Sequence, residues 1–211
     1  MSIFKHKRLK ATLFVSLFLL FTMAFAYITP FFAQSQAIAE DVLRLHIIAN
    51  SDSETDQALK YTVRDAVLRS MQDKFLGADT LEETVRIARE NRQSMQDTAN
   101  AVLAQNDAAY AAQVTIDREY FNTRAYEEVT FPAGCYESVV ITLGEGSGKN
   151  WWCVMYPAIC LPEVQEDDLD TVLNDDEMTV IESDKYDVRF KIVEIYQEIV
   201  SFFQEKTMHK K

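Results

Sequence analysis

Residues 42–67 read VLRLHIIANSDSETDQALKYTVRDAV, and the spacing of apolar residues changes once within this stretch. Val42 to Ala49 is rich in Leu and β-branched residues with partial alternation, which predicts a strand. Asn50 to Ser53 supply turn and N-cap residues, and Ser53 with Asp56 resembles a capping box. The stretch therefore predicts a strand that leads directly into a helix. The apolar face of that helix recurs every fourth residue, at Leu59, Val63, Val67, Met71 and Phe75.

The rest of the chain extends this pattern to an α+β fold. A capping box at Thr80 and Glu83 opens a second predicted helix that ends near Asn106. Period-two alternation predicts strands near 114–120, 136–143 and 151–156, with 144–150 as a hairpin loop between the last two. Residues 163–187 hold eleven acidic residues and one basic residue, which predicts a solvated loop. We expect one compact domain, in which a small, mostly antiparallel sheet is packed by two or three helices.

A C-terminal amphipathic helix completes the prediction. Its apolar residues lie at helical spacing, and we expect this stripe to pack on the sheet. The stripe consists of Val188, Ile192, Ile195, Tyr196, Ile199, Phe202 and Phe203.

The N-terminus has the order of a secretory signal. Four basic residues (Lys5, Lys7, Arg8 and Lys10) precede 29 uncharged residues that run to Ala39. Two A-x-A cleavage motifs lie in or after the apolar core, at 24–26 and 37–39. Residues 11–32 would also cross a hydrocarbon core of ~30 Å as an uncleaved anchor. Either alternative exports the remainder of the chain, so we divide the protein into a signal or anchor at 1–39 and an exported domain at 40–211.

Charge excludes two classes of partner for the exported part. The 172 residues after Ala39 hold 17 basic and 33 acidic residues, a net charge of −16. A nucleic-acid-binding protein needs a basic face to displace counterions from phosphates, so we expect no nucleic acid. The same charge argues against electrostatic binding to a membrane surface, which leaves the N-terminal segment as the predicted membrane contact.

Export permits disulfides, and the chain holds three cysteines. Cys135, Cys153 and Cys160 allow three pairings, each of which leaves one thiol. The short spacing around Pro157 favours a Cys153–Cys160 disulfide with Cys135 free.

Motifs for known chemistry are incomplete. The loop before Asn150 lacks the first Gly and the final Ser/Thr of a phosphate-binding loop. The acidic turn at 50–56 begins like a calcium loop, but Thr55 and Tyr61 stand where Gly and Glu are required. His46 and Cys135 are a conceivable thiol–imidazole pair without supporting local sequence. We therefore predict no catalytic residue, no metal ligand and no cofactor.

Three segments resemble one family, the stage II sporulation protein R of endospore-forming bacteria. The first is RLHIIANSDS at 44–53, which continues through DQALK at 56–60 and VRDAV at 63–67. The second comprises FPAG at 131–134, Tyr136, GEGSGKNWWCVMYP at 144–157, and Cys160 with Leu161. The third is VRFKIVE at 188–194. Cys135, Ala158-Ile159 and the acidic segment depart from the family pattern.

The resemblance implies a signalling protein and not an enzyme. Such proteins are made in the forespore and exported into the space between the two membranes around it. There they activate an aspartic protease in the mother-cell membrane, which removes the pro-segment of the sigma-E precursor. The alternative is an extracytoplasmic hydrolase of cell wall or peptide that uses Cys135 or the acidic turn.

A signalling protein needs a surface for its receptor, and two segments supply polar or aromatic residues for one. Capping explains part of the turn and core packing explains one Trp, because neighbouring residues of a strand point to opposite faces. The predicted partner-binding residues are His46, Asn50, Ser51, Asp52 and Asp56 in the turn, and Asn150, Trp151 and Trp152 after the Gly-rich loop.

Overall fold

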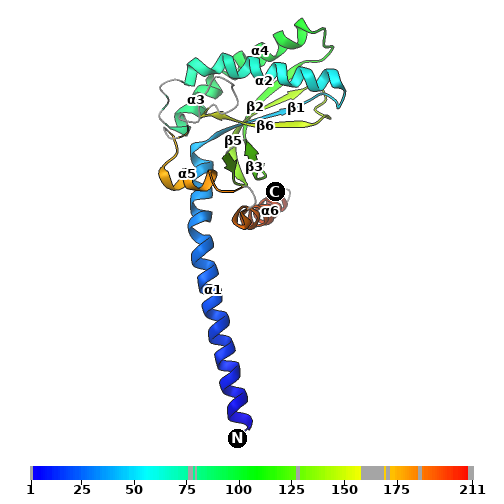
Figure 1. Ribbon diagram of the computed structural model, residues 1–211. Helices are drawn as coiled ribbons and strands as arrows, with labels where there is room; N and C mark the ends of the chain where they lie inside the picture. Colours follow the sequence, from blue (N-terminus) through cyan, green and yellow to red (C-terminus); the bar gives the residue numbers. More distant parts are fainter. Residues whose placement is uncertain are drawn as a thin grey trace.

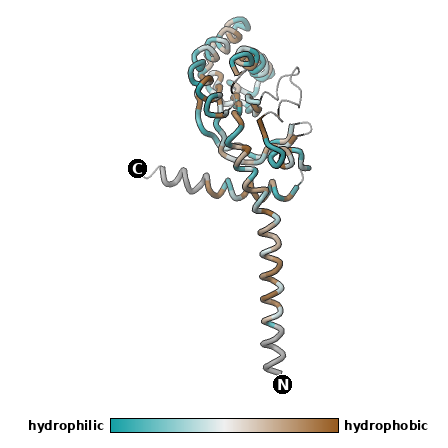
Figure 2. Tube along the Cα trace, turned by 90° about the vertical axis from the view of Figure 1, so that its left-hand side faces the viewer, coloured by the Kyte–Doolittle hydropathy of each residue, from teal (hydrophilic) through white to brown (hydrophobic). Residues whose placement is uncertain are grey.

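The computed structural model describes residues 2–75, 78, 80–126, 129–157, 169, 172–184 and 187–208, with side chains between residues 10 and 200 of these ranges. Figure 1 shows a layered domain at the end of a long helix, α1 (Ser2–Asp41). The apolar part of α1 points away from the domain (Figure 2). The predicted α+β class, with an apolar helix before the domain, is confirmed.

Four strands form the main sheet in the order β2-β5-β1-β6. Their bounds are β1 Leu43–Ile48, β2 Ala112–Phe121, β5 Gly134–Leu143 and β6 Asn150–Tyr156. β1 pairs with β5 in parallel, whereas β2–β5 and β1–β6 are antiparallel. The predicted strands are therefore present, and the sheet is mixed with a majority of antiparallel pairs.

The predicted hairpin at 144–150 is wrong, because β1 lies between β5 and β6. β1 is buried along nearly its whole length on both sheet faces, and such a strand is stabilised by a neighbour on each edge. The loop from 144 to 149 therefore spans two strand spacings, about 10 Å.

Helices α2 (Glu54–Phe75), α3 (Leu81–Glu90) and α4 (Arg92–Gln105) cover one face of the sheet (Figure 1). All five residues of the predicted helical stripe from Leu59 to Phe75 are buried there. They join Leu45 and Ile47 of β1 in one hydrophobic cluster. The periodicity in the sequence thus identified both the helix and its buried face.

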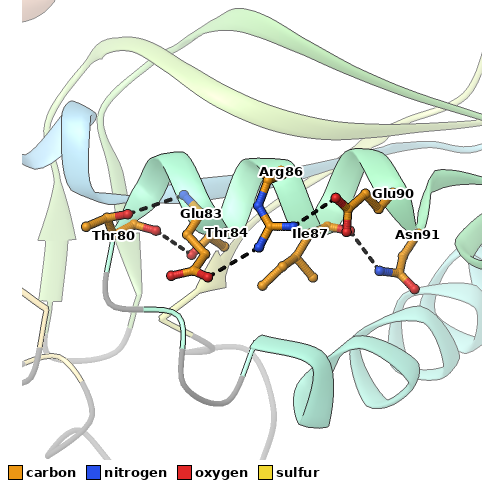
Figure 3. A network of polar contacts seen from close by, with 7 residues as sticks. All are labelled: Thr80, Glu83, Thr84, Arg86, Ile87, Glu90 and Asn91. Carbon is orange, nitrogen blue, oxygen red and sulfur yellow. Dashed lines mark hydrogen bonds and ion pairs between the residues drawn. The ribbon is translucent and has the colours of Figure 1, made fainter.

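The second predicted helix is two helices that meet at Asn91. Figure 3 shows Thr80 capping α3, where its hydroxyl accepts the Glu83 N–H, and Arg86 bridging Glu83 and Glu90. At the other end the Asn91 side chain donates to Ile87 O at 2.9 Å. A side chain that bonds the backbone in this way competes with helix continuation, which accounts for the break.

The opposite face of the sheet is covered in part by a second cluster. It combines the C-terminal third of α1 with a small hairpin, β3 (Arg124–Tyr126) and β4 (Val129–Phe131), and with α5 (Asp175–Ile181). Phe31, Ile38 and Ala39 of α1 are buried in it. α5 lies within the acidic segment predicted as a loop, where a capping box of Asn174 and Glu177 starts the helix. Burial of Val180 and Ile181 stabilises it there.

The C-terminal helix α6 (Val188–Met208) is present, but its predicted buried face is wrong between Val188 and Ile199. The side chains of Phe202 and Phe203, also predicted in this face, lie outside the described residues. Phe190 and Val193 are buried, whereas Val188, Ile195 and Ile199 are 62%, 47% and 52% exposed. Phe190 packs edge-on against Phe31 of α1, with ring centroids 4.9 Å apart. Apolar residues lie on two sides of the helix, so its sequence alone did not show which side is buried.

Candidate functional site

The sheet face opposite α2–α4 is covered at one end and exposed at the other. At the covered end, Phe121, Tyr136 and Val154 are buried in the second cluster. At the other end, Gln113, Thr115 and Asp117 of β2 and Asn150 of β6 are exposed. His46 lies at the border of the two halves.

His46 is the centre of a polar and aromatic group that we call the His46 cluster, with Glu119, Asn150 and Trp152. Its Nδ1 lies 2.9 Å from Glu119 Oε2, and its Nε2 lies 3.0 Å from Asn150 Oδ1. An imidazolium ring donates to both oxygens, while a neutral ring meets the same partners when the Asn150 amide is turned to donate. The ring also stacks on Trp152, with centroids 3.7 Å apart and planes 14° from parallel.

Strand register brings His46, Asn150 and Trp152 together. His46 is directly opposite Trp152, and Asn150, two residues before Trp152 in β6, is opposite Ile48. Residues two apart on a strand share a face, so Asn150 and Trp152 point to the same side as His46. Phe121 packs edge-on against Trp152 at 4.8 Å and closes the buried side of the cluster.

Trp151 lies on the other face, as strand alternation predicts. Its ring packs edge-on against Tyr61 at 5.2 Å, and the Arg64 guanidinium lies 4.7 Å from the ring centroid. Trp151 is therefore part of the contact between α2 and the sheet. The structure does not bring it together with His46 and Trp152.

The predicted turn residues form a separate group with the 144–149 loop, which we call the turn–loop network. Asn50 Oδ1 accepts the Glu145 N–H at 3.0 Å, and Asp52 accepts the Lys149 N–H at 2.7 Å. Lys60 donates to Lys149 O at 2.9 Å. These contacts fasten the loop to the start of α2.

Asp56 is the acceptor on which this network converges. Its carboxylate accepts from Ser51 Oγ at 2.5 Å, Tyr110 Oη at 2.5 Å and Asn50 Nδ2 at 3.0 Å. These hydrogen bonds, with Ser51 the largest contributor, lower the pKa of Asp56 to about 2. Asn50, Ser51 and Asp56 thus have a structural role that the turn sequence only partly indicated.

Two glycines of the loop allow this close approach. Gly144 has φ +57°, and a Cβ there would overlap the side chain of Asn50. A Cβ at Gly148 would overlap the carbonyl of Ser51. The Gly-rich loop therefore packs its own backbone against the β1–α2 turn.

The thiol–imidazole pair considered from the sequence does not form. Cys135 is a residue of β5, opposite Tyr120 of β2. His46 of β1 lies opposite Val140, which is five residues after Cys135 in β5. An odd number of residues places the two side chains on opposite faces of the sheet. Cys135 is free and half-buried, and burial raises the pKa of its thiol. Cys160 lies outside the described residues, so the Cys153–Cys160 disulfide stays a prediction.

Sequence reasoning missed two residues that shape this face. Glu119 was not singled out because it is one of 33 acidic residues with no distinguishing motif. Arg44 is fully buried, donates to Cys153 O at 3.1 Å and Tyr126 Oη at 2.7 Å, and is enclosed by aromatic rings. The ring centroids of Phe121 and Tyr136 lie 4.6 and 5.0 Å from its guanidinium carbon. The sequence feature that could have identified Arg44 is its position as a basic residue within an otherwise apolar predicted strand.

These features define an α+β domain carried on an N-terminal apolar helix, with an aromatic and polar cluster on a partly exposed sheet face. The chain belongs to the stage II sporulation protein R family, whose model matches residues 39–166. It is 37% identical over 127 residues to stage II sporulation protein R of Bacillus subtilis (strain 168). That match covers 60% of this chain and 57% of the relative, little more than half of the relative's length. No solved structure matches the chain. The family gives the chain a role in sporulation.

Proposed function

We propose that this chain is an exported signalling protein that activates a membrane aspartic protease of the mother cell and so causes cleavage of the sigma-E precursor. The family match over residues 39–166 carries this proposal, because it covers the sheet, α2–α4 and the His46 cluster. The basic N-terminus followed by an apolar helix supports export from the forespore into the intermembrane space.

The His46 cluster is the surface we assign to the receptor. Asn150 is exposed and Trp152 is half-buried, so both are accessible at the border of the open sheet face. Half-buried aromatic rings beside polar groups are frequent anchors of protein interfaces. Trp151 and the turn–loop network are assigned a structural role that shapes this end of the sheet.

We propose that the folded domain includes the C-terminal end of α1. Phe31, Ile38 and Ala39 contribute to the second cluster, so cleavage at the 37–39 motif would remove core residues from the exported domain expected at 40–211. Cleavage at the 24–26 motif, or retention of the whole helix as an anchor, keeps them. We propose one of these two outcomes.

Activation in a heterologous host tests the function. The chain, the protease and the sigma-E precursor are expressed together, and removal of the pro-segment is followed by immunoblotting. We expect processing with the natural chain and loss of processing with Asn150→Ala and with Trp152→Ala, since buried interface anchors commonly contribute 2 kcal/mol or more.

Matched variants separate binding from folding. Gln105→Ala changes an exposed amide on α4, away from the proposed surface, and is expected to leave processing intact. The circular dichroism spectrum of each variant shows whether it is folded. Absence of processing with the natural chain contradicts the proposed function. Normal processing with both cluster variants contradicts the assigned surface alone.

A further inference from the structure

Helix α6 has an exposed apolar stripe on the side that faces away from the domain. Phe190, Val193 and Gln197 are buried against the protein, whereas Val188, Ile195 and Ile199 are exposed. At about 100° per residue the second set lies on roughly the opposite side of the helix from the first. Tyr196, beside this stripe, is 49% exposed. Exposed apolar residues that line up on one surface mark contact sites for proteins or membranes.

The place of α6 on α1 indicates what that partner is. Residues 11–30 of α1 are exposed except for half-buried Ile28, and their twenty residues span about 30 Å as a helix, the thickness of a hydrocarbon core. The apolar window of this helix has a mean hydropathy of 2.2 and is unburied. The first buried residue of α1 after this exposed stretch is Phe31. A bilayer crossed by α1 would therefore end where the domain begins.

α6 joins α1 at that same level. The Arg189 guanidinium lies 5.0 Å from the ring centroid of Tyr27 and 4.4 Å from that of Phe31. Two helical turns further along α6, Tyr196 packs edge-on against Phe32 at 4.8 Å. Figures 1 and 2 together show that α6 runs across the direction of α1. A helix in this position lies parallel to the membrane surface when α1 is perpendicular to it.

We propose that α6 is an interfacial helix whose stripe of Val188, Ile195 and Ile199 rests in the outer surface of the bilayer that α1 spans. Aromatic and arginine side chains at the α1–α6 junction are the types that occupy the headgroup level of membranes. Together the two helices hold the domain at a fixed height and orientation above the lipid.

Apolar burial, and not charge, drives this contact. The residues after Ala39 carry a net charge of −16, so anionic headgroups do not attract the domain. On α6 itself, Lys191 and Arg189 are paired with Glu194 and Asp187 at 2.8 and 2.6 Å. We therefore expect α6 to bind zwitterionic phosphatidylcholine, with little dependence on salt.

Site-directed fluorescence of the full chain tests the proposal. In a background with Cys135, Cys153 and Cys160 replaced by Ser, single cysteines replace Ile195, Ile199, Lys191 or Gln105 and carry an NBD label, and circular dichroism confirms that this background is folded. The chain is reconstituted into phosphatidylcholine vesicles with and without doxyl-labelled lipid. We expect blue-shifted emission that doxyl lipid quenches at Ile195 and Ile199, smaller effects at Lys191, and unshifted, unquenched emission at Gln105.

Two outcomes overturn the proposal. Emission at Ile195 and Ile199 that matches Gln105 shows a water-exposed stripe. A blue shift that doxyl lipid does not quench, and that disappears when fewer chains are placed in each vesicle, shows that a second copy of the chain covers the stripe instead.

Discussion

Asp56→Asn tests the turn–loop network, because this substitution keeps the shape of the side chain and removes its charge. The carboxylate accepts three side-chain hydrogen bonds, from Ser51, Asn50 and Tyr110. An amide retains one acceptor oxygen and turns an NH₂ group toward the remaining donors. A hydrogen bond to a charged group contributes about 1.5–3 kcal/mol, and losing two of them with partial rearrangement costs about 2–4 kcal/mol.

Urea unfolding of the full chain in lipid nanodiscs measures this loss through the fluorescence of Trp151 and Trp152. For an m-value of about 2 kcal/mol/M, the loss of about 2–4 kcal/mol lowers the expected midpoint by about 1–2 M. Asp97→Asn is the matched control, since the Asp97 carboxylate is exposed on α4 and accepts a hydrogen bond from the exposed Gln93, and the substitution is expected to change stability by less than about 0.5 kcal/mol.

The pH dependence of the stability difference between the natural chain and Asp56→Asn supplies a second test. Hydrogen bonding lowers the pKa of Asp56 to about 2 in the folded protein, against about 3.9 for an unfolded chain. A lowered pKa stabilises the fold fully above the unfolded value and progressively less as pH falls toward the folded value. The gap between the natural chain and Asp56→Asn should therefore be largest above pH ~5 and narrow between pH ~4 and ~2. An equal midpoint for both proteins at pH 7, or a gap that does not change with pH, refutes the role given to Asp56.

Three further predictions concern the ends of the domain and its cysteines. Phe190→Ala should lower the free energy of unfolding by about 3–5 kcal/mol because it empties a buried site, whereas Ile195→Ala should lower it by less, because that side chain lies outside the packed core of the protein; the reverse order in urea unfolding would mean that α6 packs by its other face. A non-reduced digest analysed by mass spectrometry should contain a Cys153–Cys160 linked peptide, and a linked peptide with Cys135 would contradict this pairing. Purified Cys135→Ser should behave like the natural chain on cell-wall and peptide substrates, and turnover that the substitution abolishes would establish the alternative hydrolase.

Local elements were largely predictable because their signals are local. The fourfold spacing from Leu59 to Phe75 identified the buried face of α2, and alternation located β2, β5 and β6. Neighbouring Trp151 and Trp152 were correctly predicted to face opposite sides of a strand. In each case the periodicity within one helix or strand was sufficient to predict which side chains share a face.

Pairings between distant segments were not predictable in this way. The hairpin expected at 144–150 failed because β1, about 100 residues earlier, inserts between the strands that this loop joins. α6 was assigned the wrong buried face because both sides of the helix are apolar and only packing on α1 distinguishes them. Glu119 became part of the site only when β2 came to lie beside β5.

The sequence by itself determined the apolar N-terminal segment, the acidic character, the α+β class and the family, because these depend on composition, periodicity and motifs read along the chain. Only the tertiary structure decided that Asn50 and Asp56 support the fold, and that His46, Glu119, Asn150 and Trp152 form one cluster. The physical reason is strand register. Residues 46, 119, 150 and 152 come from three strands, and their side chains meet only when those strands occupy their places in one sheet.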